Sequence, residues 1–123
     1  MTGLGDLTVA DDYYVLDGHD FRRPVDYAEW IAMWKQRDAR RVASTEVGAS
    51  TVSTVFLGVD HGWGGGRPLL FETMVFGGVD GEPQWRWHTW DEAQSGHERI
   101  VEALRTGRGL DDIADDKTET DPS

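Results

Sequence analysis

Four side chains in the middle of the chain could carry acid–base chemistry: Asp60, His61, Glu72 and His88. They fall in or beside neighbouring predicted strands, so one end of a sheet could bring them together. An imidazole oriented by a carboxylate can serve as a general base. The same residues could also be separate surface groups with ordinary hydrogen bonds, and Glu72 could pair with an arginine at the edge of the core. The sequence leaves both interpretations open.

Other routes to catalysis find less support. The chain contains no cysteine, which excludes disulfides, thiolate metal sites and a thiol nucleophile. Its four histidines are never spaced at i and i+4, and no His-Glu-x-x-His pattern occurs. No serine lies in a Gly-x-Ser-x-Gly elbow. We therefore predict no metal ion and no cofactor, and an enzyme is the less favoured class.

The segment 61–67 (HGWGGGR) is rich in glycine and contains one tryptophan. Backbone N–H groups of such segments can cradle an anion, but the Gly-Lys-Ser/Thr ending of a phosphate loop is missing and no helix is predicted to follow. A flexible hairpin loop is the favoured interpretation. Its tryptophan has little around it to bury the ring, and exposed aromatic side chains are typical of binding surfaces. The candidate binding residues are Trp63, Gly64, Gly65 and Arg67.

Two amphipathic helices are predicted. The first, over 26–38, begins with a capping box formed by Asp26 and Glu29. Its apolar residues recur at helical spacing, which predicts that both of its tryptophans belong to the core: Tyr27, Trp30, Ile31 and Trp34. The second helix begins at a capping box of Thr89 and Glu92, and Gly107 is a natural stop.

Five runs rich in β-branched and aromatic residues predict strands at 13–16, 41–47, 50–59, 69–76 and 84–88. Gly48 and Ala49 form a two-residue link with glycine first, as a type II′ hairpin requires. Alternation places Val52, Thr54 and Phe56 on one side of their strand. The short links favour antiparallel pairing. We predict an α+β fold, an antiparallel β meander of about four to five strands with two amphipathic helices packed on one face.

The charge is concentrated at the two ends of the chain. The net charge is −11, while residues 1–20 hold five acidic residues and no basic one, and residues 111–123 hold six acidic residues and one lysine. We predict a loose N-terminal arm at 1–12, one domain at 13–110 and a disordered acidic tail at 111–123. The absence of a basic surface disfavours nucleic acid as a partner, and no apolar run is long enough to span a membrane.

Three motifs together are distinctive: FLGVDH at 56–61, PLLFETMVFGG at 68–78, and TWDEA at 89–93 followed by Gly96 and His97. In these the chain resembles a family of small uncharacterised proteins of bacteriophages and prophages, including those of actinobacteria. The resemblance covers about residues 40–100. It implies a phage protein in the cytoplasm of a bacterial host, and it implies no activity, ligand or catalytic residue.

Two function classes follow from these observations. The favoured one is a phage-encoded accessory protein that binds a host or phage protein and modulates host physiology or defence. The alternative is a small enzyme or nucleotide- or ligand-binding protein that uses Asp60, His61, Glu72 and His88. The sequence determines neither the partner nor the oligomeric state, so a homo-oligomer stays open.

Overall fold

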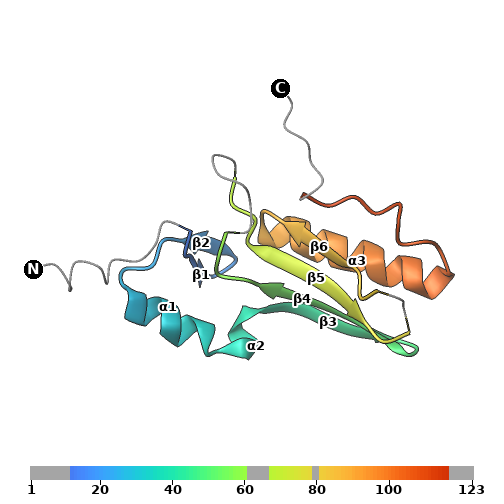
Figure 1. Ribbon diagram of the computed structural model, residues 1–123, viewed down its shortest axis with the longest axis horizontal. Helices are drawn as coiled ribbons and strands as arrows, with labels where there is room; N and C mark the ends of the chain where they lie inside the picture. Colours follow the sequence, from blue (N-terminus) through green and yellow to red (C-terminus); the bar gives the residue numbers. More distant parts are fainter. Residues whose placement is uncertain (1–11, 61–66, 79–80, 117–123) are drawn as a thin grey trace, which may run out of the picture.

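The computed structural model describes residues 12–60, 67–78 and 81–116 (Figure 1). Two short strands and two short helices come first, and the longest helix comes last. The elements are β1 (Val15–Asp17), β2 (Asp20–Arg22), α1 (Tyr27–Trp34), α2 (Arg37–Arg40), β3 (Arg41–Val47), β4 (Ser50–Phe56), β5 (Phe71–Phe76), β6 (Gln84–Trp87) and α3 (Trp90–Thr106).

Four strands form one antiparallel sheet in the order β3-β4-β5-β6, while β1 and β2 form a separate hairpin. The predicted α+β class is therefore confirmed. Gly48 has a φ of 60° at the β3–β4 link, which is the conformation that its place in the turn requires. Val52, Thr54 and Phe56 are fully buried on one side of β4, as their alternation predicts.

Helix α3 covers one face of this sheet and contacts all four of its strands (Figure 1). The Thr89 side chain accepts a hydrogen bond from the Glu92 N–H at the start of the helix, and Gly107 ends it with a φ of 74°. Under the helix lies a core that includes Phe56, Phe71, Trp87 and Ile100. Gly96 allows α3 to lie close to the ring of Trp87 on β6, because a Cβ at this position would overlap that ring.

A chain of buried polar groups crosses the same core. The Trp87 Nε1–H donates to the Thr73 hydroxyl at 3.1 Å, and the hydroxyls of Thr73 and Thr54 are 2.6 Å apart. His97 of α3 lies 2.8 Å from Thr54 Oγ1 through Nδ1 and 2.9 Å from Thr45 Oγ1 through Nε2. A hydroxyl can donate one hydrogen bond and accept two, so the hydroxyls of Thr54 and Thr45 give both ring nitrogens of His97 a partner.

The first helix is placed differently from the second. It was predicted to share a face of the sheet with α3, but α1 packs against β1 and α2. The helix ends at Trp34, because the chain turns at Lys35 into the four-residue helix α2. Trp30 is buried and its Nε1–H donates to the Gly58 carbonyl at 2.9 Å. Trp34 is 40% exposed, so the prediction that it belongs to the core is wrong.

The C-terminal residues also correct the sequence analysis. The tail from Asp111 was predicted to be disordered, but residues 111–116 are described and lie against β6. Asp115 is buried and Ile113 packs on the core. Backbone N–H groups of β6 and of the residue after it supply the partners that make burial of this acidic segment favourable. The remainder of the predicted tail and residues 1–11 of the predicted arm lie outside the described residues.

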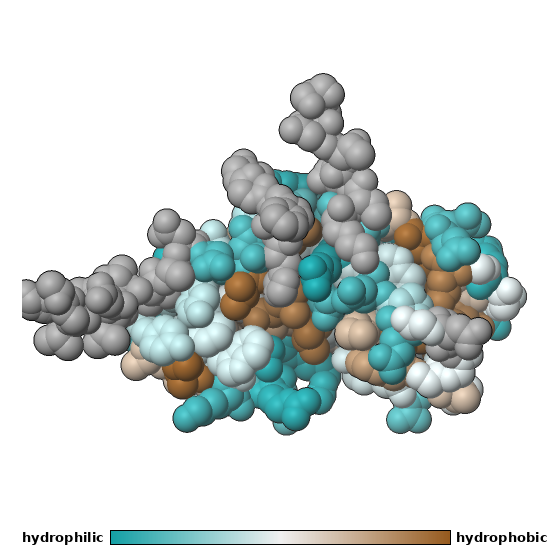
Figure 2. Space-filling view, viewed as in Figure 1, coloured by the Kyte–Doolittle hydropathy of each residue, from teal (hydrophilic) through white to brown (hydrophobic). Residues whose placement is uncertain are grey.

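The outer surface shows no feature that identifies a function directly. Hydrophobic residues on the side in view form separate small areas among hydrophilic ones (Figure 2). Within the described ranges, no helix has the length and apolar character needed to cross a membrane.

Candidate functional site

Of the four candidate catalytic residues, Asp60, Glu72 and His88 lie in the described part of the chain. Asp60 accepts a hydrogen bond from the Leu69 N–H at 2.9 Å, and its own N–H donates to the Asp12 carbonyl at 2.8 Å. These bonds place Asp60 at the base of the glycine-rich segment. His61 lies outside the described residues, as do Trp63, Gly64 and Gly65 of the predicted binding segment.

Glu72 forms an ion pair with an arginine, which is one of the alternatives that the sequence analysis left open. Its carboxylate is 3.1 Å from Nε of Arg86, and the two residues are register partners on β5 and β6. Both side chains are on the face of the sheet opposite α3, because their strand neighbours Thr73 and Trp87 point towards the helix. An ion pair between cross-strand neighbours explains Glu72 as a structural residue.

His88 is buried at the end of β6 and contacts backbone atoms. Its Nδ1 is 3.0 Å from the Pro68 carbonyl, and since a carbonyl only accepts, this nitrogen carries the proton. Asp60 and His88 therefore hold the adjacent residues 68 and 69, whereas Glu72 interacts elsewhere. The contacts of both residues position the start of β5. Arg67, the remaining candidate of the binding segment, is exposed.

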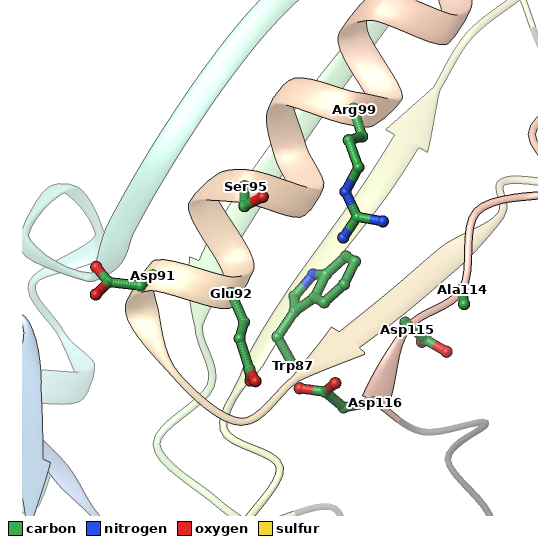
Figure 3. Close-up of a pocket in the computed structure, with 8 residues that line it drawn as sticks. All are labelled: Trp87, Asp91, Glu92, Ser95, Arg99, Ala114, Asp115 and Asp116. Atoms are coloured by element: carbon green, nitrogen blue, oxygen red, sulfur yellow. The ribbon is translucent and has the colours of Figure 1, made fainter.

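The structure reveals a cavity that the sequence analysis missed. It has a volume of about 390 Å³ and lies between α3 and residues 114–116 (Figure 3). Trp87 and Arg99 line it, with the guanidinium carbon 5.7 Å from the centroid of the indole ring. Two carboxyl groups, those of Glu92 and Asp116, face one another across it (Figure 3).

These two carboxyl groups converge on one backbone donor. The His88 N–H is 2.7 Å from Asp116 Oδ2 and 3.3 Å from Glu92 Oε1. Burial, together with the hydrogen bond to Glu92, raises the pKa of Asp116 to about 6. Burial alone would raise the pKa of Glu92 too, but the hydrogen bond from Asp116 and the charge of Arg67 outweigh it and lower that pKa. The pair can therefore hold one proton at mildly acidic pH, below about 6.

No signal in the sequence links these residues. Glu92 is recognisable as a capping-box residue and Asp116 as part of an acidic run, and 23 residues separate them. Among the residues that the structure describes, no group of three or more histidine and acidic side chains could hold a metal ion. The pair can exchange a proton, and the described lining of the cavity also contains the hydroxyl of Ser95.

A second feature is a row of stacked rings along α1. The ring centroids of Tyr13 and Trp30 are 4.4 Å apart, and those of Trp30 and Trp34 are 5.2 Å apart. Tyr27 stacks on Trp30 at 6.0 Å, and the Arg40 guanidinium lies 4.1 Å from the centre of the Trp34 ring. Tyr27 and Trp34 are 43% and 40% exposed. We call these five residues the aromatic row.

Four of the five members of the aromatic row lie in a basic part of an acidic chain. Residues 21–41 contain six basic and three acidic residues, a net charge of +3 against −11 for the whole chain. Tyr13 of the row forms an isolated β-bridge with Val59. The sequence pattern predicted the helix and its apolar stripe, but not that part of the stripe would face solvent.

Comparisons of the chain with protein-family models, with curated proteins and with solved structures found no match.

Proposed function

We propose that this protein is a phage-encoded accessory protein that binds a protein of the host or the phage and is not itself a catalyst. The observation that supports this most is the exposure of Tyr27 and Trp34 in the aromatic row. Aromatic and arginine side chains dominate the energetics of protein interfaces. The rings of Tyr13, Tyr27 and Trp34 stack on Trp30. Arg40 lies over the ring of Trp34.

The aromatic row is held in place before any partner binds. Trp30 anchors it through the bond from its Nε1–H to the Gly58 carbonyl, and Arg40 donates from Nη1 to the Phe56 carbonyl at 3.0 Å. Each of these bonds fixes a side chain that would otherwise lose rotamer entropy on binding. A preorganised surface of this kind binds at lower cost than a flexible one.

The alternative, a small enzyme or a nucleotide- or ligand-binding protein built on Asp60, His61, Glu72 and His88, has less support. Glu72 is engaged by Arg86, and Asp60 by the Leu69 N–H. His88 bonds through Nδ1 to the Pro68 carbonyl. A general base in this group would need His61 to act with partners other than Glu72.

The test is affinity capture from a lysate of an actinobacterial host, with variant baits compared at equal concentration. We expect the double variant Tyr27→Ala/Trp34→Ala to lose at least about tenfold in capture of a partner, as interface anchors do. The matched control is Lys35→Ala/Gln36→Ala, which changes two exposed residues next to the same helix and should capture normally.

Two further baits separate the competing functions. Trp63→Ala tests whether the glycine-rich segment contributes to the same surface, and we expect weaker capture with unchanged stability. His61→Ala should behave like the wild type. Undiminished capture by the double variant, or a loss confined to His61→Ala, would refute the proposed surface and favour the alternative.

A further inference from the structure

The outer edge of β6 is closed by side chains rather than by another strand. The N–H groups of residues 86 and 88 point away from β5: they donate to Asp115 Oδ2 at 2.6 Å and to Asp116 Oδ2 at 2.7 Å. The residue between them, Trp87, uses its carbonyl to accept from the Leu70 N–H on the inner side. The two carboxylates thus occupy the positions that carbonyl groups of a neighbouring strand would take.

The segment Leu110–Asp116, which we call the edge cover, is also attached through the hydrogen bond between Asp116 and Glu92. The Ile113 carbonyl accepts from Trp85 Nε1–H at 3.1 Å, and the Leu110 and Ile113 side chains pack on the core. The cover follows α3 through Gly107 and Gly109, where an added Cβ would meet only open space. Such a connection allows the cover to move without disturbing the helix.

The charged groups around Asp116 come from every neighbouring element. Helix α3 contributes Asp91, Glu92 and Arg99, the end of β6 contributes His88, and the cover itself contributes Asp115. Arg67, before β5, lies near enough to act on Glu92. Of these groups, Glu92 shares the His88 N–H with Asp116, so the charge of this pair acts directly on the attachment of the cover.

We propose that the edge cover is a pH-responsive closure of the β6 edge, which is held most firmly when Glu92 and Asp116 share one proton and opens more readily when both are ionised or both are protonated. An open cover leaves the outward N–H groups of residues 86 and 88 available for pairing with another strand. This device is independent of the aromatic row.

The sign of the dependence follows from the two pKa values. Asp116 has its pKa raised to about 6, so its contribution to closure is complete at low pH and is lost as the pH rises through about 6. Glu92 has its pKa lowered from 4.5, so its contribution is present above 4.5 and is lost as the pH falls through its lowered value. Closure is therefore greatest near pH 4.5 and is progressively lost as the pH rises through about 6.

Amide hydrogen exchange measured residue by residue by NMR tests the proposal on the full chain. We expect the protection of the Arg86 and His88 amides, corrected for the intrinsic pH dependence of exchange, to fall about fourfold from pH 5.5 to pH 7.5. The Leu70 amide is the internal control, because it bonds to the inner side of β6 and reports opening of the sheet itself. The indole N–H resonance of Trp85 should shift over the same pH range, since it bonds to the cover.

Two variants make the outcome decisive. Asp116→Asn keeps a carbonyl oxygen for the His88 N–H but cannot ionise, so the fall in protection between pH 5.5 and pH 7.5 should disappear. Asp112→Asn removes the same charge from an exposed position in the cover and should leave the fall unchanged. Protection in the wild type that does not depend on pH, or an equal fall in Asp116→Asn, would overturn the proposal. So would an equal fall at Leu70.

Discussion

The region under α3 and the region of α1 both contain tryptophan, but Trp87 under α3 is buried whereas Trp34 of α1 is partly exposed. Trp87 is 2% exposed, lies between the sheet and α3, and donates its Nε1–H to Thr73. Trp34 is 40% exposed and lies at the end of a helix of eight residues, between Trp30 and Arg40. The difference shows that the element covering a ring, and not the residue type, decides whether it stabilises the fold or remains available to a partner.

The two helices explain this contrast. α3 has 17 residues and crosses four strands, so its apolar face is buried along most of its length. α1 is less than half as long and buries Trp30 alone among its residues. A short helix cannot cover a sheet, and the rings beyond its buried side face solvent.

Replacing Trp87 should have the largest effect on stability. We expect Trp87→Ala to lower the free energy of unfolding by about 3–5 kcal/mol, because it opens a cavity in the core and removes a donor from the chain of polar groups. Urea denaturation followed by circular dichroism measures it. A loss of only about 1 kcal/mol, the value expected for Trp34→Ala, would contradict the distinction between a buried and an exposed tryptophan.

Gly96→Ala should come next, with a loss of about 1–3 kcal/mol from the clash with the Trp87 ring. Helix propensity alone predicts the opposite sign, since alanine is favoured over glycine by about 1 kcal/mol inside a helix. Ser95→Ala, at the exposed neighbouring position, is the control and should be nearly neutral. A stabilised Gly96→Ala variant would mean that the core under α3 adapts more freely than its packing indicates.

Trp34→Ala should lower the free energy of unfolding by about 1 kcal/mol, because the substitution loses a stacked ring and the contact with Arg40 but creates no internal cavity. The thermal midpoint of the variant, compared with that of Trp87→Ala, measures the contrast directly. If the loss reached the range expected for Trp87, the aromatic row would be a structural core and not an open surface.

The smallest effect should be a pH dependence confined to the α3 region. Burial lowers the pKa of His97 below its ordinary 6.5, so the folded state disfavours the imidazolium. Stability from this group is therefore present above pH 6.5 and is lost as the pH falls through the lowered value. Wild-type stability should decline faster on acidification than that of His97→Gln, and parallel curves for the two proteins would contradict the neutral assignment.

Local rules in the sequence predicted much of the fold. The capping boxes at Asp26 and Thr89, the glycine-first turn at Gly48 and the stop at Gly107 each act within a few residues. Alternation along β4 placed its buried residues correctly. The fold class follows from these signals, because antiparallel pairing through short links depends on neighbouring segments.

The candidate site could not be predicted in the same way. The carboxylates of Asp115 and Asp116 meet β6 across nearly 30 residues, and the Glu72–Arg86 pair, although an arginine partner was one of the open alternatives, depends on strand register. The tail composition predicted disorder because the tail offers little apolar surface to bury, and the prediction missed the N–H groups of β6 that bind its carboxylates.

The sequence by itself determined which side chains share a face of each helix and strand, since periodicity is a property of the local backbone. Only the tertiary structure decided which faces are covered. The stripe of α1 became a partly exposed aromatic row because no sheet lies over Trp34, whereas the matching face of α3 became the core. Burial depends on packing between segments that are distant in the chain, and no pattern within one segment specifies its neighbours.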